Sequence, residues 1–363
     1  MIMQFGGGQA EVPSGSRQID GHGGARAVLA AVATYLPEES LTSREVEQRI
    51  AAHGPYRPRP GLIEAVTGIA ARYVAPADWQ ASDLAAAAAR KLLAGAGLTA
   101  GDLDLLVFAS ASQDMVEPAT AHILGAKLGT RCPVFDVKNA CNSLLNGLQV
   151  AEALIAAGQY RRVLVCTGEL PSRAVRWAVR DRGQFVESFP GYTLSDSGAA
   201  VLLEAGTGPA EDPDGPGIFH RSFGADSSAW EVGTLPGGGT AHPRDLEATY
   251  FRMDGARLHA AFEALGPGLL HQALAAHGLS WADFAVVAVH QVTVPLLEAF
   301  LRGTGLDARP LVPVLREHGN LASASLPFQL ARALEQGRCG PGDRIALIGL
   351  AGGVSLGVVF ARL

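Results

Sequence analysis

Apolar runs and helix-patterned segments alternate along most of this chain. Residues 105–109 and 286–289 are uninterrupted apolar runs, and a strand buried on both faces has this pattern. Residues 144–157 carry apolar positions at helical spacing. Such alternation with short turns is typical of α/β proteins. The pattern therefore predicts an α/β fold.

The alternation repeats along the chain. Residues 97–107 match residues 278–288 without a gap, and each segment is expected to contain a helix end, a turn and a buried strand. Two ordinary strand–helix units could match by coincidence, but two further matches follow in the same order, which favours duplication. These are the helices ending near Gly158 and Gly337 with the strands after them, and the closing segments 197–203 and 352–360.

The duplication predicts two halves, residues 26–205 and 218–363. The segment between them, 206–217, is rich in Gly, Pro and Asp and poor in apolar residues, which is typical of a linker. Residues 1–25 have glycine clusters and lack a secretory signal, so we expect a flexible leader.

Composition narrows the function classes. The 363 residues are 48% hydrophobic with a net charge of -6 and no long Lys/Arg block, which predicts a large core and argues against nucleic acid or an anionic membrane as partner. The sequence contains no run of 18 uncharged apolar residues, so it predicts no membrane-spanning helix. The four cysteines lack metal-type or disulfide-framework spacing, which fits a reducing cytoplasm and predicts no bound metal.

Cys141 is the leading candidate for chemistry. It lies between the strand-like residues 133–137 and the helix-patterned residues 144–157. Unpaired backbone N–H groups and the helix dipole at a helix N-terminus favour thiolate, so this position predicts an activated nucleophile. The alternative is a buried structural cysteine.

His290 and Asn320 are the companions of Cys141. His290 ends an apolar strand at a point where the sequence turns polar, which is where side chains meet a crevice in an α/β sheet. Asn320 heads the helix that corresponds to the one after Cys141. A hydrogen-bonded core histidine and a helix N-cap are the structural alternatives. About a pseudo-twofold axis, however, the duplicated halves would bring all three side chains to one pocket.

Together these residues resemble the Cys-His-Asn site of the thiolase superfamily, in its β-ketoacyl-acyl carrier protein synthase III branch. The resemblance runs from about Arg26 to the C-terminus and includes residues 67–69, 135–137, 290–291, 319–320 and 352–353. It implies a thiolase-like duplicated five-layer αβαβα sandwich. It also implies an acyltransferase of the ketosynthase type that uses coenzyme A or acyl carrier protein thioesters and has no bound cofactor.

A closer resemblance is to the olefin-biosynthesis thiolases, which join two fatty acyl-CoA molecules head to head. It rests on residues 80–83 and 290–292 and above all on Glu117, before Pro118. It implies a homodimer in which Glu117 reaches the neighbouring active site. A solvated loop charge is the alternative for Glu117. Val66 stands where many synthase III enzymes have an arginine that contacts coenzyme A, so a carrier-protein donor stays open.

The resemblance implies a division of labour. Cys141 takes the first acyl group, with the backbone N–H groups of Cys141 and Gly352 binding the oxyanion. His290 and Asn320 stabilise an enolate of the second thioester, and Glu117 removes its C2 proton. The product is a 2-alkyl-3-oxoacyl compound of the fatty acid or polyketide type.

Three alternatives remain at this stage. A decarboxylative synthase III or an acyltransferase of secondary metabolism would use the same Cys-His-Asn site without Glu117. A papain-like hydrolase also uses Cys, His and Asn, but the duplication argues against it. A non-catalytic scaffold is disfavoured because all four candidate side chains occur in one chain.

Overall fold

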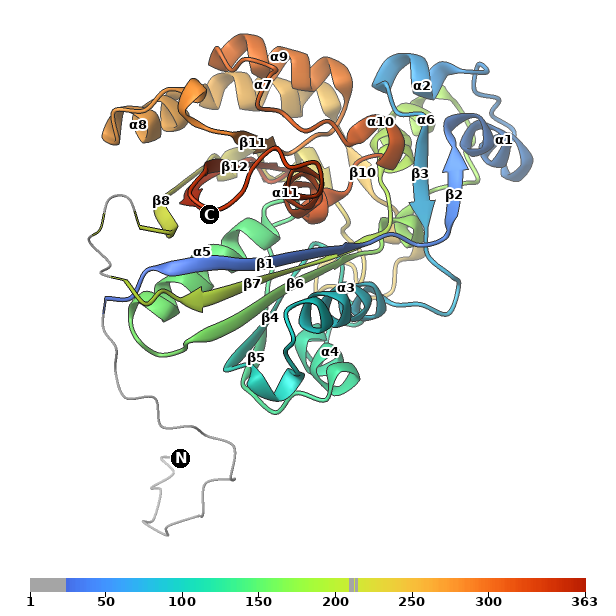
Figure 1. Ribbon diagram of the computed structural model, residues 1–363. Coiled ribbons are helices and arrows are strands. Elements are labelled where there is room, and N and C mark those ends of the chain that lie inside the picture. Colours follow the sequence, from blue (N-terminus) through green and yellow to red (C-terminus); the bar gives the residue numbers. More distant parts are fainter. Residues whose placement is uncertain (1–23, 209–211, 213–214) are drawn as a thin grey trace, which may run out of the picture.

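The computed structural model describes residues 24–208, 212 and 215–363, in which two β-sheets lie between layers of helices (Figure 1). The first sheet has the strand order β1-β7-β6-β4-β5. Its strands are β1 (Ala27–Tyr35), β4 (Leu105–Ala109), β5 (Val134–Val137), β6 (Arg162–Glu169) and β7 (Ser197–Ala205).

The second sheet repeats the first. Its order is β11-β12-β13-β8, and its strands are β8 (Gly217–Ala225), β11 (Val286–Val289), β12 (Arg344–Ala351) and β13 (Ser355–Arg362). The pair β11 and β12 is parallel, like β4 and β6, and the remaining pairs of this sheet are antiparallel, like β6 with β7 and β7 with β1. A single parallel bridge between Val287 and Leu311 occupies the place that β5 has beside β4. The two sheets therefore share one strand pattern, as the duplication predicted.

Five layers result from strands that bury both faces. Residues 105, 107 and 109 of β4 enter a central core together with α5 (Ser143–Ala156) and α11 (Ser325–Glu335). Residues 106 and 108 pack on the other side against α3 (Ala81–Gly95) and α4 (Thr120–Leu128). The outer face of the second sheet packs against α8 (Gly268–Ala276) and α9 (Val294–Thr304), with α7 (Gly255–Leu265) beside them. The predicted αβαβα sandwich is confirmed.

A side module is inserted in the first half, where it has a small core of its own. It includes β2 (Glu39–Thr42), α1 (Ser43–His53), α2 (Leu62–Thr67), β3 (Ala71–Val74) and α6 (Arg182–Ser188). The short elements of the second half are β9 (Gly233–Thr234), β10 (Arg252–Met253) and α10 (Leu315–His318). The 3-10 helices are η1 (Ala100–Asp102), η2 (Pro171–Ala174), η3 (Phe189–Thr193), η4 (Ser227–Val232), η5 (Leu246–Thr249), η6 (Trp281–Asp283) and η7 (Ala322–Ala324).

The matching segments of the sequence adopt matching structures. Thr99 and Asp102 form a capping box at η1, and Ser280 and Asp283 form the same box at η6. A buried strand follows each box. The connection between the halves runs from the end of β7 at Ala205 to the start of β8 at Gly217. The division into residues 26–205 and 218–363 stays a prediction, and the predicted leader lies outside the described residues except for positions 24 and 25.

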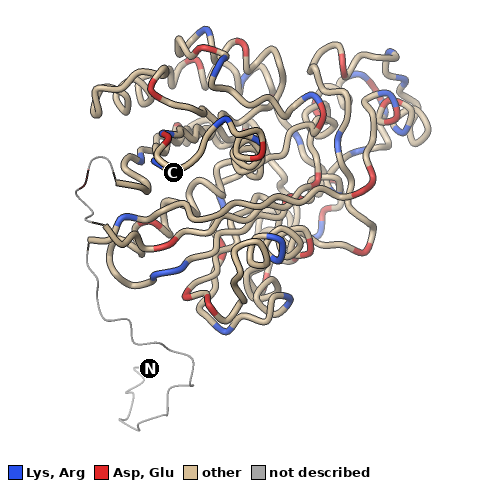
Figure 2. Tube along the Cα trace, viewed as in Figure 1, with Lys and Arg blue, Asp and Glu red and all other residues tan. Residues whose placement is uncertain are grey.

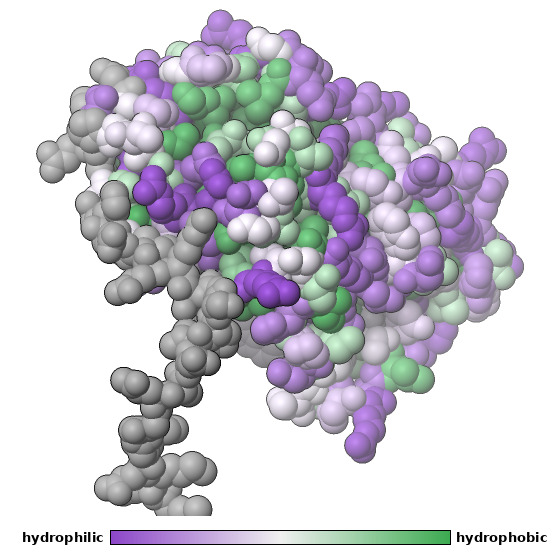
Figure 3. Space-filling model, turned by 60° about the horizontal axis from the view of Figure 1, so that its bottom comes forward, coloured by the Kyte–Doolittle hydropathy of each residue, from purple (hydrophilic) through white to green (hydrophobic). Residues whose placement is uncertain are grey.

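Surface features agree with the charge pattern of the sequence. Lys and Arg positions are interspersed with Asp and Glu rather than gathered in one block (Figure 2). Apolar and polar side chains are also mixed on the face shown in Figure 3, as on most globular proteins. Among the described helices, none is long and apolar enough to cross a membrane.

Candidate active site

Cys141 lies in a tight turn between β5 and α5 and immediately precedes Asn142, the N-cap residue of α5. Ala140 has φ 46°, a left-handed conformation that non-glycine residues rarely adopt and that is concentrated at functional sites. The Ser143 hydroxyl fixes the turn: its Oγ accepts from Asn139 N–H at 2.8 Å and donates to the Ala140 carbonyl at 2.7 Å. The sequence thus places the thiol on a rigid, strained turn.

The turn is also fixed to the second half of the chain. The Asn142 amide nitrogen donates to the backbone oxygen and the hydroxyl of Ser355, at 3.2 and 2.9 Å. Ser355 is the first residue of β13 and follows the turn that contains Gly352. Cys141 and Gly352 therefore belong to two segments that are hydrogen-bonded to each other.

The electrostatic expectation for Cys141 needs correction. Burial and, as the second cause, the charge of Glu169 together raise the pKa of the thiol to about 12. Cys141 precedes the N-cap of α5, so the loss of hydration and the nearby carboxylate outweigh the helix terminus. The resting nucleophile is a neutral thiol, not the thiolate that the sequence suggested. All four cysteines are free.

His290 directly follows β11 and is 4% exposed. Its backbone N–H donates to Ile348 of the parallel neighbour β12 at 2.9 Å. Among the described residues its Nδ1 atom has no hydrogen-bond partner. Burial lowers the pKa of the imidazole to about 4, so the ring is neutral near pH 7. A buried ring nitrogen without a partner is unusual for a structural core histidine and suits a residue that awaits a ligand.

Gln291 holds the end of β11 in place. Its amide nitrogen donates to the Val312 carbonyl and to Gln329, each at 3.0 Å, and its amide oxygen accepts from the backbone of Val314 and Leu315. Its own N–H donates to Ser325, the first residue of α11. The histidine that precedes it is therefore set on a rigid support beside the segment that carries Asn320.

Asn320 belongs to residues 319–324, the Asn320 loop, which joins α10 to α11. Its N–H donates to the Thr193 carbonyl and its carbonyl accepts from Ser195 N–H. Its side-chain oxygen accepts from Ala322 N–H at 3.0 Å, a local capping contact of the kind considered as the alternative role. That contact occupies the amide oxygen and leaves Nδ2 as the donor of this side chain.

The Asn320 loop also meets the end of β6. The Ser323 hydroxyl lies 2.7 Å from that of Thr167 and donates to the Glu169 carboxylate. The loop contacts α5 as well, which begins two residues after Cys141. The structure thus brings the Cys141 turn, the His290 strand end and the Asn320 loop to one region between the halves.

Glu117 lies apart from these three residues. It is exposed on residues 110–119, the Glu117 loop, which joins β4 to α4 and also exposes Met115 and Val116. Its peptide bond to Pro118 is cis. Within the described chain no hydrogen bond or ion pair joins Glu117 to Cys141, His290 or Asn320. The site of a single chain is therefore built without it.

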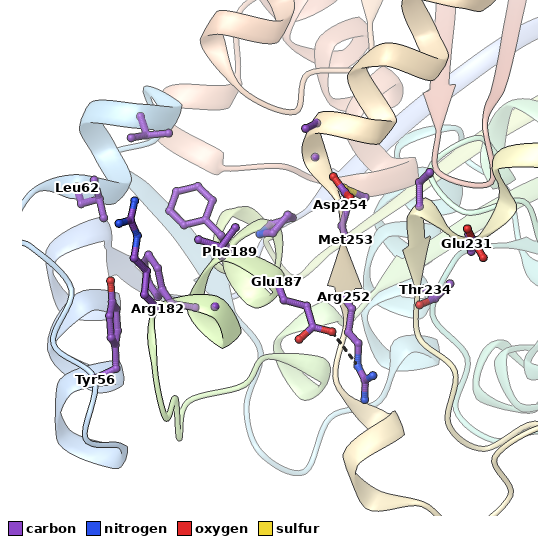
Figure 4. Close-up of a pocket in the computed structure, with 18 residues that line it drawn as sticks. Tyr56, Leu62, Arg182, Glu187, Phe189, Glu231, Thr234, Arg252, Met253 and Asp254 are labelled. Atoms are coloured by element: carbon purple, nitrogen blue, oxygen red, sulfur yellow. Dashed lines mark ion pairs between the residues drawn. The ribbon is translucent and has the colours of Figure 1, made fainter.

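A cavity of about 760 Å³ opens between the side module and the second half. Figure 4 shows Arg182 and the ion pair between Arg252 and Glu187, whose charged atoms lie 3.7 Å apart. Met253 lines the cavity, and its Cε lies 3.9 Å from where a Cβ on Gly352 would be. The cavity thus extends toward the Gly352 turn. Its lining is Tyr56, Leu62, Val66, Arg182, Gly183, Phe185, Val186, Glu187, Phe189, Pro190, Glu231, Val232, Thr234, Arg252, Met253, Asp254, Gly255 and Ala256.

Sequence reasoning missed the cations of this cavity. Arg57 follows the lining residue Tyr56, but its guanidinium donates to the Gly54 and Tyr56 carbonyls. Arg182 and Arg252 lie in segments without a distinguishing motif. Sequence reasoning also missed Glu169, although an acidic residue at the end of an apolar strand is a usable signal. No group of three or more His, Cys, Asp or Glu side chains in the described residues could hold a metal ion.

Comparisons with known proteins identify the family. Residues 135–227 match the family model for 3-oxoacyl-[acyl-carrier-protein] synthase III, and residues 274–363 match the model for its C-terminal part. The β-ketoacyl-[acyl-carrier-protein] synthase III of Acidiphilium cryptum is 32% identical over 338 residues, 93% of this chain and 99% of the relative. That of Rhodospirillum centenum is 33% identical over 341 residues, with the same coverage.

Solved structures agree. A structure of OleA from Xanthomonas campestris superposes with a TM-score of 0.82 at 26% identity, covering 94% of this chain and 99% of that chain. The synthase III of Pseudomonas aeruginosa superposes with a TM-score of 0.77 at 28% identity, covering 93% and 98%. The chain therefore belongs to the 3-oxoacyl-[acyl-carrier-protein] synthase III family of the thiolase superfamily and is an acyltransferase of the ketosynthase type.

Proposed function

We propose that this ketosynthase joins two fatty acyl thioesters by a non-decarboxylative Claisen condensation through an acyl group on Cys141. The observation that carries the proposal is the convergence of a strained cysteine turn, a buried neutral histidine and an asparagine loop between the two halves. Thioester exchange needs a soft nucleophile and oxyanion donors, and these segments supply both.

In the first half-reaction the Cys141 sulfur attacks the thioester carbonyl. Because the thiol is neutral at rest, its proton must leave as the bond forms, and we assign its acceptance to the neutral His290 imidazole. The backbone N–H groups of Cys141 and Gly352 receive the oxyanion. The departing coenzyme A or carrier thiolate takes the proton back and leaves as a thiol.

In the second half-reaction His290 and the Asn320 amide nitrogen donate hydrogen bonds to the carbonyl oxygen of the incoming thioester. A neutral imidazole can donate from one ring nitrogen, and the occupied Asn320 oxygen leaves its nitrogen as the donor. These bonds stabilise the enolate that forms when a C2 proton is removed. Attack of C2 on acyl-Cys141 gives a 2-alkyl-3-oxoacyl thioester and frees the cysteine.

We assign the removal of the C2 proton to Glu117 of a partner subunit in a homodimer. The exposed position of Glu117, between the exposed Met115 and Val116 on one side and Pro118 on the other, supports the assignment. An interface would desolvate this loop, and desolvation raises the basicity of a carboxylate. The free Cys141 thiolate then recovers the proton, so the cycle balances.

The 760 Å³ cavity is the proposed entrance for the thioester carrier. Arg182 and Arg252 offer positive charge for phosphate, and Met253 connects the cavity to the Gly352 turn. OleA has been crystallised with lauric acid and lauroyl-CoA, which supports an acyl-CoA donor here. Val66 lines the same cavity, so the phosphate contact would come from other side chains.

The alternative is a decarboxylative synthase III that extends an acyl group with a malonyl thioester. The curated relatives with 32 and 33% identity carry the synthase III name and favour it. In that reaction the loss of carbon dioxide generates the carbanion, so Glu117 has no task.

Product analysis separates the two reactions. The protein is incubated with one long-chain acyl-CoA, with and without malonyl thioester, and 2-alkyl-3-oxo acids and their ketones are measured. We expect condensation without malonyl thioester, and its loss in Glu117→Ala while Cys141 acylation continues. Condensation that requires malonyl thioester, or that survives in Glu117→Ala, contradicts the proposal. Glu298→Ala, on the exposed face of α9, is the matched surface control.

A further inference from the structure

A buried carboxylate outside the Cys-His-Asn set lies between the start of the Glu117 loop and the Asn320 loop. Glu169 is the last residue of β6 and is 1% exposed. A buried carboxylate must be satisfied by donors or paired with a cation, because its transfer from water is costly. Where the donors of Glu169 come from is therefore informative.

One set of donors comes from the start of the Glu117 loop. The N–H of Ala111 donates to Glu169 Oε1 at 3.0 Å. The N–H and hydroxyl of Ser112 both lie within hydrogen-bond distance of Oε2, at 3.3 and 3.2 Å. The Ser112 hydroxyl also accepts from Leu170 N–H at 2.9 Å. Glu169 thus fixes the start of the Glu117 loop.

The other donors come from β6 and the Asn320 loop. The Ser323 hydroxyl donates to Oε1, and the Thr167 hydroxyl, 3.4 Å from Oε1, lies 2.7 Å from Ser323. Ser323 is three residues after Asn320, so Glu169 holds this loop against β6. One side chain therefore joins the loops that carry Glu117 and Asn320.

The carboxylate also acts on the nucleophile. Its charge, after burial, is the second cause that raises the pKa of Cys141. Burial lowers the pKa of Lys138, the charges of Glu169 and Asp136 oppose that shift, and its ammonium donates to Gln113. Asp136 accepts from the N–H groups of Thr120 and Ala121. Asp136 therefore binds the first two N–H groups of α4, and these are different from the donors to Glu169.

We propose that Glu169 is a positioning residue, which fixes the Glu117 and Asn320 loops relative to each other and places a negative charge beside the resting thiol. This role rests on the proposed function, since it depends on the tasks assigned to Cys141, Glu117 and Asn320. The charge adds to the effect of burial in keeping Cys141 a neutral thiol, which limits its reaction with other electrophiles. The hydrogen bonds hold the Asn320 loop in its own active site and fix the loop that presents Glu117 to the active site of the partner subunit.

Four variants test the proposal: Glu169→Gln removes the charge, Glu169→Asp keeps it, and Ser323→Ala removes one donor. Glu152→Gln alters another buried carboxylate, on α5, which pairs with Arg221. Each is followed by the pH dependence of iodoacetamide alkylation of the Cys141 peptide. Acylation and condensation are then measured separately with a long-chain acyl-CoA.

We expect the alkylation curve of Glu169→Gln to move to lower pH, while those of Glu169→Asp, Ser323→Ala and Glu152→Gln stay at the wild-type position. Condensation should fall by about 10- to 100-fold in Glu169→Gln and Ser323→Ala, with acylation retained, because misplaced groups lose rate of this order. An unshifted curve in Glu169→Gln, or wild-type condensation in Ser323→Ala, overturns the proposal. Wild-type protein that is never acylated overturns the proposed function instead, and the alkylation curves still report on Glu169.

Discussion

Acid pH should destabilise this protein through His290, and the lowered pKa of this histidine determines how much unfolding free energy is lost. The ordinary pKa of histidine is 6.5, and burial lowers that of His290 to about 4. Between these values the unfolded chain binds a proton that the folded chain excludes, so stability falls as pH falls. The full shift of about 2.5 units corresponds to about 3 kcal/mol of unfolding free energy.

The test compares wild type with His290→Asn, which cannot titrate. From pH 7.5 to 5.5 the wild type should lose about 1.3 kcal/mol more unfolding free energy than the variant. Urea unfolding at one protein concentration, followed by circular dichroism, measures the difference. His220 and His318, whose pKa values burial also lowers, are present in both proteins and cancel. A difference that stays constant with pH refutes the reasoning.

Three further predictions follow from the site. Alkylation of Cys141 in the wild type should rise about tenfold per pH unit from pH 7 to 9, because the thiol pKa is about 12, and a plateau in this range contradicts the neutral resting thiol. Asn320→Ala should still form acyl-Cys141 but condense about 100-fold more slowly, as expected for one lost oxyanion donor. Product formation is measured in quenched time courses, and a condensation rate equal to that of the wild type would exclude Asn320 as an oxyanion donor. Gly349→Ala places a methyl group 2.0 Å from Asn142 Oδ1, so urea unfolding should show a loss of about 1–3 kcal/mol of unfolding free energy. Gly101→Ala is the control, because its methyl group would lie 3.6 Å from its nearest neighbour and should cause no such loss.

The fold could be predicted because local sequence patterns determine it. Residues 105–109 are apolar at every position, and the structure buries both faces of that strand between two helix layers. The matching capping boxes of η1 and η6 make the duplication visible in the sequence alone. The second sheet has only a single bridge, between Val287 and Leu311, where the first sheet has β5. The sequence pattern did not predict this difference.

The site was only partly predictable, because its electrostatics depends on contacts between distant segments. The sequence placed Cys141 near a helix start, which holds, but the charge state inferred from that position was wrong. The pKa depends on burial and on Glu169, 28 residues away in the chain. The cavity lined by Arg182 and Arg252 joins segments from both halves, so no single stretch of sequence reveals it.

The central claim is a covalent acyl intermediate on Cys141. Intact-protein mass spectrometry, after incubation with a long-chain acyl-CoA and no second donor, tests it most directly, with Cys141→Ala as control and peptide mapping to locate the adduct. The account predicts a mass increase of one acyl group on Cys141 in the wild type and none in the variant. An unmodified wild type that nevertheless forms product, or an adduct on Cys132, Cys166 or Cys339 instead, would contradict it.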